Sequence, residues 1–191
     1  MRNFIYRIQW TLRQRAAAIL YSMQRPAGVN HVRNPKNMLF VLSGLLGDSV
    51  MSQPAIAAAR DHWPGAQITV LGKRHNRELL KADPCIDEFY VCDADLFSLR
   101  RSAEIDGLKE WLQKSRFDAA IILLGDQYAH LLARAGIPVR AGVKGTILER
   151  CLTHVYEIGS PREWGTRERL NCLRVLGADV ADRLPRLYVD A

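Results

Sequence analysis

Short apolar runs alternate with longer amphipathic segments from Asn37 onward, and this alternation limits the folds open to the chain. The apolar runs have the length and aliphatic content of strands that are buried on both faces, at 38–42, 67–72, 86–92, 118–125, 139–143 and 154–158. The segments between and after them predict helices, at 49–62, 74–83, 104–115, 127–136 and 166–177. Such an order predicts an α/β fold, a Rossmann-like parallel sheet sandwiched by helices.

Composition places the chain among globular proteins. Its 191 residues can bury a core, and 48% of them are hydrophobic while 25% are charged. No apolar run reaches the roughly 18 residues of a membrane span. The four cysteines lie at least seven positions apart, without a CxxC pair, and the histidines have no zinc-site spacing. We therefore predict free, buried thiols in a reducing compartment and no metal site.

The net charge of +7 is concentrated near the N-terminus. Residues 1–47 contain seven basic residues and no acidic ones, whereas 20 basic residues balance 20 acidic ones from Asp48 onward. A nucleic-acid-binding face would spread basic residues over the folded body. We therefore expect no nucleic-acid partner.

Residues 1–25 have the pattern of a basic amphipathic helix. Apolar residues recur there at spacings of three or four, at Ile5, Ile8, Leu12, Ala16, Ile19 and Met23. Such a helix can lie on an anionic membrane surface, and it can equally pack on its own domain or on a partner domain. Both alternatives remain open. Prolines and a glycine then predict a linker up to residue 36.

The turn after the first apolar run carries the most informative residues. Gly44 and Gly47 flank this turn, but the spacing GLLG matches neither a dinucleotide-binding motif nor a P-loop. Asp48 and Ser49 stand where the next helix is predicted to begin, and both residue types are favoured helix caps. The carboxyl ends of parallel strands are also where α/β sheets bind ligands. Asp48 is therefore either a cap, which spacing alone favours, or a working carboxylate.

Residues 38–72 resemble the opening of the family 9 glycosyltransferases, the heptosyltransferases of lipopolysaccharide core synthesis. The resemblance rests on the Gly47–Asp48 pair after the first strand and on Pro54–Ala55, six residues beyond the aspartate. It continues in unbroken order to about residue 180. The resemblance implies the N-terminal half of a GT-B fold, with 1–36 as helix and linker, 37–183 as the acceptor-side domain and 184–191 as the start of an interdomain linker.

What the resemblance implies about chemistry is inverting transfer of a sugar from a nucleotide-sugar donor to a glycolipid or oligosaccharide acceptor. Asp48 would be the general base that takes the proton from the acceptor hydroxyl. Acceptor contacts are expected from the turn and from the end of the fourth strand, at Ser43, Gly44, Gly47, Ser49 and Asp126. No metal or cofactor is expected, and the location would be cytoplasmic, at the inner face of the membrane.

The chain departs from the family pattern in ways that affect this expectation. Leu42 and Gly44 stand where the family often has Arg and Ser, so the acceptor is not expected to be the usual inner-core sugar. The donor-binding half would have to come from a separate C-terminal domain. The alternative function is a non-catalytic binding or partner module. Arg140 and Lys144 are either contacts for acceptor phosphates or carboxylates, or solvated charges.

Removal of residues 1–25 tests the membrane alternative. These residues carry five arginines, and each basic residue near an anionic surface contributes about 1 kcal/mol of attraction. We expect the shortened chain to co-sediment less with vesicles rich in phosphatidylserine, while neither form binds neutral phosphatidylcholine vesicles. Equal sedimentation of the two forms with anionic vesicles would exclude this role.

Overall fold

The computed structural model describes residues 32–94, 96, 103–146, 148–158 and 165–189. The amphipathic helix predicted within residues 1–25 lies outside this part of the chain. Within it, six strands form one sheet: β1 (Asn37–Leu42), β2 (Gln67–Gly72), β3 (Glu88–Val91), β4 (Ala119–Leu124), β5 (Val139–Val143) and β6 (His154–Tyr156).

The strands are parallel and lie in the order β3-β2-β1-β4-β5-β6. The chain therefore builds the sheet outward from β1 to β3, returns to the centre, and builds the other half from β4 to β6. Met38 of β1 pairs with Ile68 of β2 on one side and with Ala119 of β4 on the other. This is the doubly wound order of Rossmann-like folds, and it confirms the predicted fold class.

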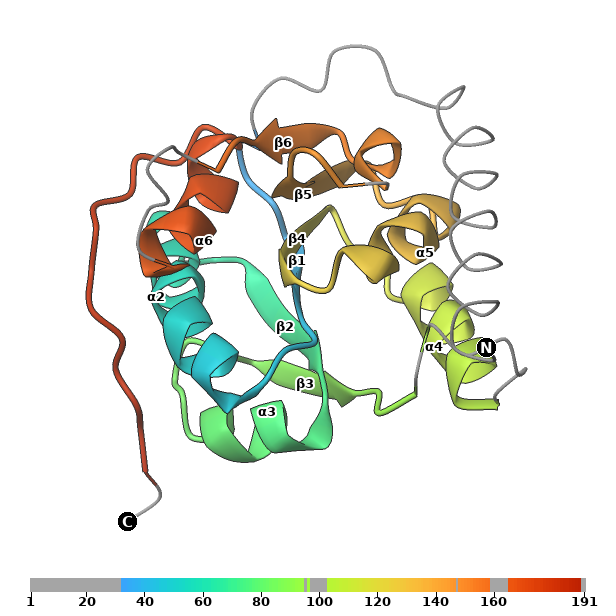
Figure 1. The fold of residues 1–191 in the computed structure, drawn as a ribbon, viewed down its shortest axis with the longest axis horizontal. Coiled ribbons are helices and arrows are strands. Elements are labelled where there is room, and N and C mark those ends of the chain that lie inside the picture. Colours follow the sequence, from blue (N-terminus) through green and yellow to red (C-terminus); the bar gives the residue numbers. More distant parts are fainter. Residues whose placement is uncertain (1–31, 95, 97–102, 147, 159–164, 190–191) are drawn as a thin grey trace, which may run out of the picture.

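Helices cover both faces of the sheet (Figure 1). One face carries α2 (Leu46–His62), α3 (Arg74–Leu80) and α6 (Gly165–Arg174). The opposite face carries α4 (Ala103–Lys114) and α5 (Ala129–Arg134), the latter preceded by the 3-10 turn η1 (Asp126–Tyr128). Because α2 and α6 belong to opposite ends of the chain, their contact joins the two halves of the fold.

The two cores explain why the central strands are continuously apolar. Met38 and Phe40 of β1 lie in the core under α2 and α6, whereas Leu39 and Val41 lie in the core under α4 and α5. Successive side chains of a strand point to opposite faces, so a central strand covered on both sides needs apolar residues at every position. All residues of β1 from Met38 to Leu42 are fully buried.

The predicted elements are confirmed, with one informative difference at the candidate site. The helix expected from about residue 49 begins at Leu46, so Asp48 occupies its third position instead of the cap. The Asp48 side chain still accepts a hydrogen bond from the Leu45 main-chain N–H, at 2.8 Å from Oδ2. From the third position of the helix, Asp48 therefore accepts a hydrogen bond from a main-chain N–H group that has no partner within the helix.

Residues beyond α6 continue as an extended segment beside α2 (Figure 1). The Arg186 main-chain N–H donates to Gln53 Oε1 at 3.0 Å, and Arg183 forms an ion pair with Asp61 at 2.7 Å. Leu184 and Leu187 remain exposed on this segment. The first residues of the predicted linker at 184–191 thus have no regular secondary structure. Its role between two domains stays a prediction.

Two predictions from composition can be compared with this part of the chain. All four cysteines are free; Cys92, Cys151 and Cys172 are buried as predicted, whereas Cys85 is only half-buried. No helix of the described residues is long and apolar enough to cross a membrane.

Gly72 and Gly107 offer a matched test of packing at the end of β2. A Cβ on Gly72 would lie 2.8 Å from the Leu42 carbonyl oxygen, whereas one on Gly107 in α4 meets nothing within 4 Å. We expect Gly72→Ala to lower the free energy of unfolding by about 1–3 kcal/mol through overpacking. Gly107→Ala should raise it by about 0.5–1 kcal/mol, because alanine favours a helix interior. Urea unfolding measures both, and an unchanged midpoint for Gly72→Ala would contradict this account.

Candidate functional site

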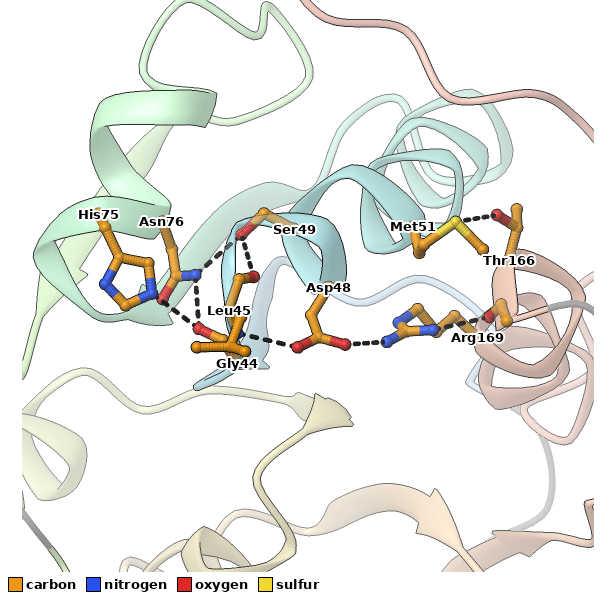
Figure 2. A network of polar contacts seen from close by, with 10 residues as sticks. Gly44, Leu45, Asp48, Ser49, Met51, His75, Asn76, Thr166 and Arg169 are labelled. Carbon is orange, nitrogen blue, oxygen red and sulfur yellow. Dashed lines mark hydrogen bonds and ion pairs between the residues drawn. The ribbon is translucent and has the colours of Figure 1, made fainter.

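The turn between β1 and α2 is held by α3 (Figure 2). The Gly44 carbonyl oxygen accepts a hydrogen bond from Asn76 Nδ2 at 3.0 Å and lies 2.8 Å from His75 Nε2. Asn76 is fully buried, and its Nδ2 also donates to Ser49 Oγ at 2.8 Å. Its Oδ1 accepts from the Lys73 main-chain N–H at 2.8 Å. The buried amide thereby fixes the turn and the first residues of α2 against the neighbouring loop.

Asp48 extends from this fixed turn with both carboxylate oxygens bound. Oδ2 accepts the Leu45 N–H, and Oδ1 accepts a hydrogen bond from Arg169 Nη2 at 3.1 Å. The Asp48 side chain is nevertheless 32% exposed, whereas that of Arg169 is 10% exposed. A carboxylate near the start of a helix also interacts favourably with the helix dipole. Asp48 is therefore held rigidly and still presents an accessible edge.

Arg169 comes from α6, far from Asp48 in sequence. Its Nη1 donates to the Gly165 carbonyl oxygen at 2.9 Å, which folds the guanidinium back over the first turn of α6. A Cβ on Gly165 would lie 3.0 Å from Nη1, so glycine leaves room for this arrangement. The neighbouring Thr166 hydroxyl donates to Met51 Sδ of α2 at 3.6 Å, as Figure 2 shows. The Asp48–Arg169 ion pair is thus part of the α2–α6 contact.

A cleft of about 650 Å³ opens beside this ion pair. It lies at the carboxyl ends of β4, β5 and β6, and the first turns of α2 and α6 line it. Its volume falls in the usual range of small-molecule sites. The position of the cleft follows from the strand order. The chain runs from β1 to β2 on one side, whereas β4 lies on the other side of β1 and begins the second half of the sheet, and α/β sheets bind ligands where the order reverses in this way.

The residues predicted from the sequence divide into two groups in the structure. Asp48, Gly47 and Asp126 line the cleft. Ser43, Gly44 and Ser49 are not among its lining residues. The structure thus brings the two aspartates to one cavity, while much of the turn supports them from behind.

Gly44 and Ser49 have structural roles that the sequence did not indicate. A Cβ on Gly44 would lie 2.7 Å from Asp48 Cβ and 2.6 Å from Asp48 Oδ2, so glycine leaves room for the carboxylate to fold back. Ser49 is fully buried, and its hydroxyl lies 3.4 Å from the Leu45 carbonyl oxygen to which it donates. The Ser49 hydroxyl is thus held between Leu45 and Asn76, and its contact with an acceptor sugar stays a prediction.

Asp126 lies at the start of η1, directly after Gly125, which has φ 110°. A Cβ on Gly125 would approach the Ser43 Cβ to 3.1 Å, so this turn also depends on glycine. Burial raises the pKa of the Asp126 carboxyl above its ordinary value, against the opposing effect of main-chain hydrogen bonds. Burial likewise raises the pKa of Tyr128 to about 12, and this hydroxyl hydrogen-bonds with the Ser43 side chain.

Sequence reasoning missed three polar residues of the cleft: Thr146, Glu168 and Arg169. The sequence predicts only a helix at 166–177 for the segment that holds Glu168 and Arg169. Its leucines Leu170, Leu173 and Leu176 are buried in the structure. Glu168 and Arg169 are also buried, whereas charged residues of an amphipathic helix are usually exposed. No spacing pattern links them to Asp48.

Arg140 and Lys144 lie outside this cavity. Arg140 is buried, and its guanidinium donates to the carbonyl oxygens of Ile137 and Cys151, so the solvated-charge interpretation is wrong for it. Lys144 is exposed and forms an ion pair with Glu157. Neither side chain lines the cleft. Among the described residues, no group of three or more His, Cys, Asp and Glu side chains is placed to hold a metal ion.

The fold is similar to solved glycosyltransferase structures. A family 9 glycosyl transferase from Veillonella parvula matches with a TM-score of 0.70 and 19% identity, over 83% of this chain and 46% of the other. The E. coli ADP-heptose lps heptosyltransferase II matches with a TM-score of 0.64 and 23% identity, over 81% of this chain and 47% of the other. The E. coli heptosyltransferase WaaC with ADP-2-deoxy-2-fluoro heptose matches with a TM-score of 0.62 and 17% identity, over 78% of this chain and 51% of the other.

These likenesses confirm the predicted resemblance at the level of fold. The chain has the Rossmann-like α/β arrangement found in family 9 glycosyltransferases and heptosyltransferases. It spans about half the length of each of these structures. No model of a known protein family matches the sequence, and no curated protein sequence matches it either.

Asp126 and Asp182 should respond to pH with opposite signs. Because burial raises the folded-state pKa of Asp126, its ionisation lowers stability as pH rises through that pKa. Asp126→Asn should therefore be more stable than the parent chain at pH 7, and the difference should vanish on acidification toward about pH 4. Urea unfolding between about pH 4 and 7 measures this difference.

Asp182 is the control, since hydrogen bonds from Arg174 and Arg167 lower its pKa. The stability it contributes is present above the unfolded-state pKa and is lost as pH falls through the lowered folded-state value. Asp182→Asn should therefore be less stable than the parent chain at pH 7. If both variants shift stability in the same direction at pH 7, the assigned environments are wrong.

Proposed function

We propose that this chain is the acceptor-side domain of a glycosyltransferase that transfers a sugar with inversion from a nucleotide-sugar donor to a surface glycan acceptor. The observation that carries the proposal is the position of Asp48, a partly exposed carboxylate that lines a cleft at the carboxyl edge of the sheet. The likeness in fold to heptosyltransferase structures supports the same class of reaction. The donor would be held by a second domain or a separate chain.

In the proposed reaction Asp48 is the general base. The acceptor hydroxyl oxygen attacks the anomeric carbon of the donor and forms the new glycosidic bond. The bond between that carbon and the phosphate oxygen breaks, and the nucleoside diphosphate leaves with the electron pair. The acceptor proton passes to Asp48. An ionised carboxylate has about four acceptor positions, and two are used by Leu45 and Arg169, so two remain and the acceptor hydroxyl can use one of them.

Arg169 is a positioning residue in this scheme. Its hydrogen bond fixes one oxygen of Asp48, and the Leu45 N–H fixes the other, so the carboxylate cannot rotate freely. Geometry to the hydroxyl is the first requirement for a general base. The guanidinium is itself held by Gly165 on α6. The orientation of the base therefore depends on the packing of α6 against α2.

The second candidate function is a non-catalytic binding or partner module. One observation favours it: Asp48 forms an ion pair with Arg169 that joins α2 to α6. A module of this kind would bind the acceptor, or a chain that carries the donor site, without transferring sugar. The two functions differ in whether Asp48 is needed for turnover.

Asp48→Asn separates them. The substitution keeps the shape of the side chain but removes the base, so nucleoside diphosphate release from a nucleotide sugar should fall about 10²–10⁴-fold. Release would be followed with the chain supplied with a donor-binding domain and a glycolipid acceptor extract. Asp61→Asn, at the far end of α2 in an exposed ion pair, is the matched control and should retain the parent rate. Equal rates for Asp48→Asn and the parent chain would refute the general-base assignment.

A further inference from the structure

The peptide that joins Gly44 to Leu45 connects Asp48 to α3. Because a trans peptide is planar, its C=O and N–H groups point in opposite directions and turn as one unit. The Leu45 N–H donates to Asp48 Oδ2 at 2.8 Å, and the Gly44 oxygen faces α3 (Figure 2). The orientation of this one peptide therefore decides whether an N–H group points at the carboxylate.

Two side chains of α3 hold the oxygen of this peptide. His75 Nε2 lies 2.8 Å from the Gly44 oxygen, and Asn76 Nδ2 donates to the same oxygen at 3.0 Å. A carbonyl oxygen has two lone pairs and only accepts, so it can take both bonds, and His75 Nε2 carries the hydrogen of its bond. The Lys73 N–H donates to Asn76 Oδ1 at 2.8 Å, which fixes the orientation of the amide. Both groups of α3 are therefore donors to one peptide oxygen.

The peptide that follows Leu45 is held differently, by α2 itself. The Leu45 carbonyl oxygen accepts the main-chain N–H of Ser49 at 3.2 Å and its hydroxyl at 3.4 Å. The Gly44 oxygen lies one residue before this first helical bond. Among the described residues, its hydrogen bonds come from the side chains of α3. The peptide that holds Asp48 therefore depends on a neighbouring helix for its orientation.

His75 and Asn76 differ in what else they do. Asn76 is fully buried and also bonds to Ser49 and Lys73, so its loss would disturb α2 and α3 as well. His75 is half-buried, and the hydrogen bond of its ring within the described part of the chain goes to the Gly44 oxygen. His75 does not line the cleft. Its effect on Asp48 therefore passes through the peptide.

We propose that His75 is a positioning residue for Asp48. Its Nε2–H holds the Gly44–Leu45 peptide so that the N–H group fixes one carboxylate oxygen, while Arg169 fixes the other. A hydrogen bond to a peptide oxygen also polarises the N–H of the same peptide, which strengthens the bond to the carboxylate. The effect on turnover rests on the proposed function, whereas the link from His75 to the Leu45 N–H does not.

Selective isotope labelling observes this link directly. Glycine labelled with ¹³C at its carbonyl and leucine labelled with ¹⁵N together mark only peptides in which glycine precedes leucine, and the sequence has two, Gly44–Leu45 and Gly107–Leu108. In NMR spectra of the full chain, His75→Leu should move the Gly44 carbonyl carbon and the Leu45 amide proton to lower frequency, because both hydrogen bonds weaken. The Gly107–Leu108 peptide, inside α4, is the internal reference and should not move.

A conservative variant separates the hydrogen bond from packing. His75→Gln replaces the imidazole Nε2–H with an amide N–H at a similar reach, so both signals should return toward their parent positions. His62→Leu removes an exposed histidine from the last turn of α2 and is the matched control, which should change neither signal. Unchanged Gly44–Leu45 signals in His75→Leu, or no recovery in His75→Gln, would overturn the proposal.

The sugar-transfer assay measures the consequence for Asp48. With a donor-binding domain and a glycolipid acceptor extract, His75→Leu should lower kcat by up to about 10²-fold, because a small displacement of a reacting group has an effect of that size. The apparent KM for the acceptor should not change, since His75 does not line the cleft. His75→Gln should restore most of kcat. A raised KM with unchanged kcat would contradict the positioning role.

The two measurements distinguish this inference from the proposed function. If the Gly44–Leu45 signals respond to His75 while Asp48→Asn has no effect on sugar transfer, His75 still positions the carboxylate and the general-base assignment is wrong. If transfer depends on Asp48 while these signals ignore His75, only the role of His75 is wrong.

Discussion

The parallel pairing of β1 with both β2 and β4 is the constraint on which the rest of the structure depends. A strand with neighbours on both sides and helices on both faces needs apolar residues where it is covered, and β1 is apolar and fully buried from Met38 to Leu42. Because the chain leaves β1 in one direction and begins the other half of the sheet with β4, the connections after these two strands diverge. The cleft lies on the β4 side of this divergence, and Asp48 stands at its edge.

Asp48 combines a role in the fold with accessibility to a ligand. The hydrogen bond to the Leu45 N–H is the local interaction of a capping residue, whereas the ion pair with Arg169 joins helices that are far apart in sequence. The two bonds restrict the carboxylate but leave part of it exposed to the cleft. The alternatives that the sequence left open, a structural cap and a working carboxylate, are therefore compatible in one side chain.

The same turn shows how the supporting residues differ from those that face a ligand. Gly44 allows the carboxylate to fold back, and its carbonyl oxygen anchors α3 through Asn76. Ser49 completes this buried network. These residues came from the same motif as Asp48, yet they act on its geometry and not on the cavity. Gly47, by contrast, lines the cleft, and a Cβ there would meet nothing within 4 Å.

The sequence by itself determined the order of strands and helices, the α/β class and the position of Asp48 after the first strand, because hydrophobic periodicity and turn residues are local signals. Only the tertiary structure decided that Arg169 pairs with Asp48 and that Ser49 is buried, because these depend on how α6 and α3 pack against α2. Arg140 illustrates the same limit: a charge in a strand can be solvated or buried, and only the structure shows that its guanidinium is buried and donates to the carbonyl oxygens of Ile137 and Cys151. Contacts between residues more than a hundred positions apart leave no periodic trace in one sequence, so the cleft that Asp48 shares with Arg169 could be found only after folding.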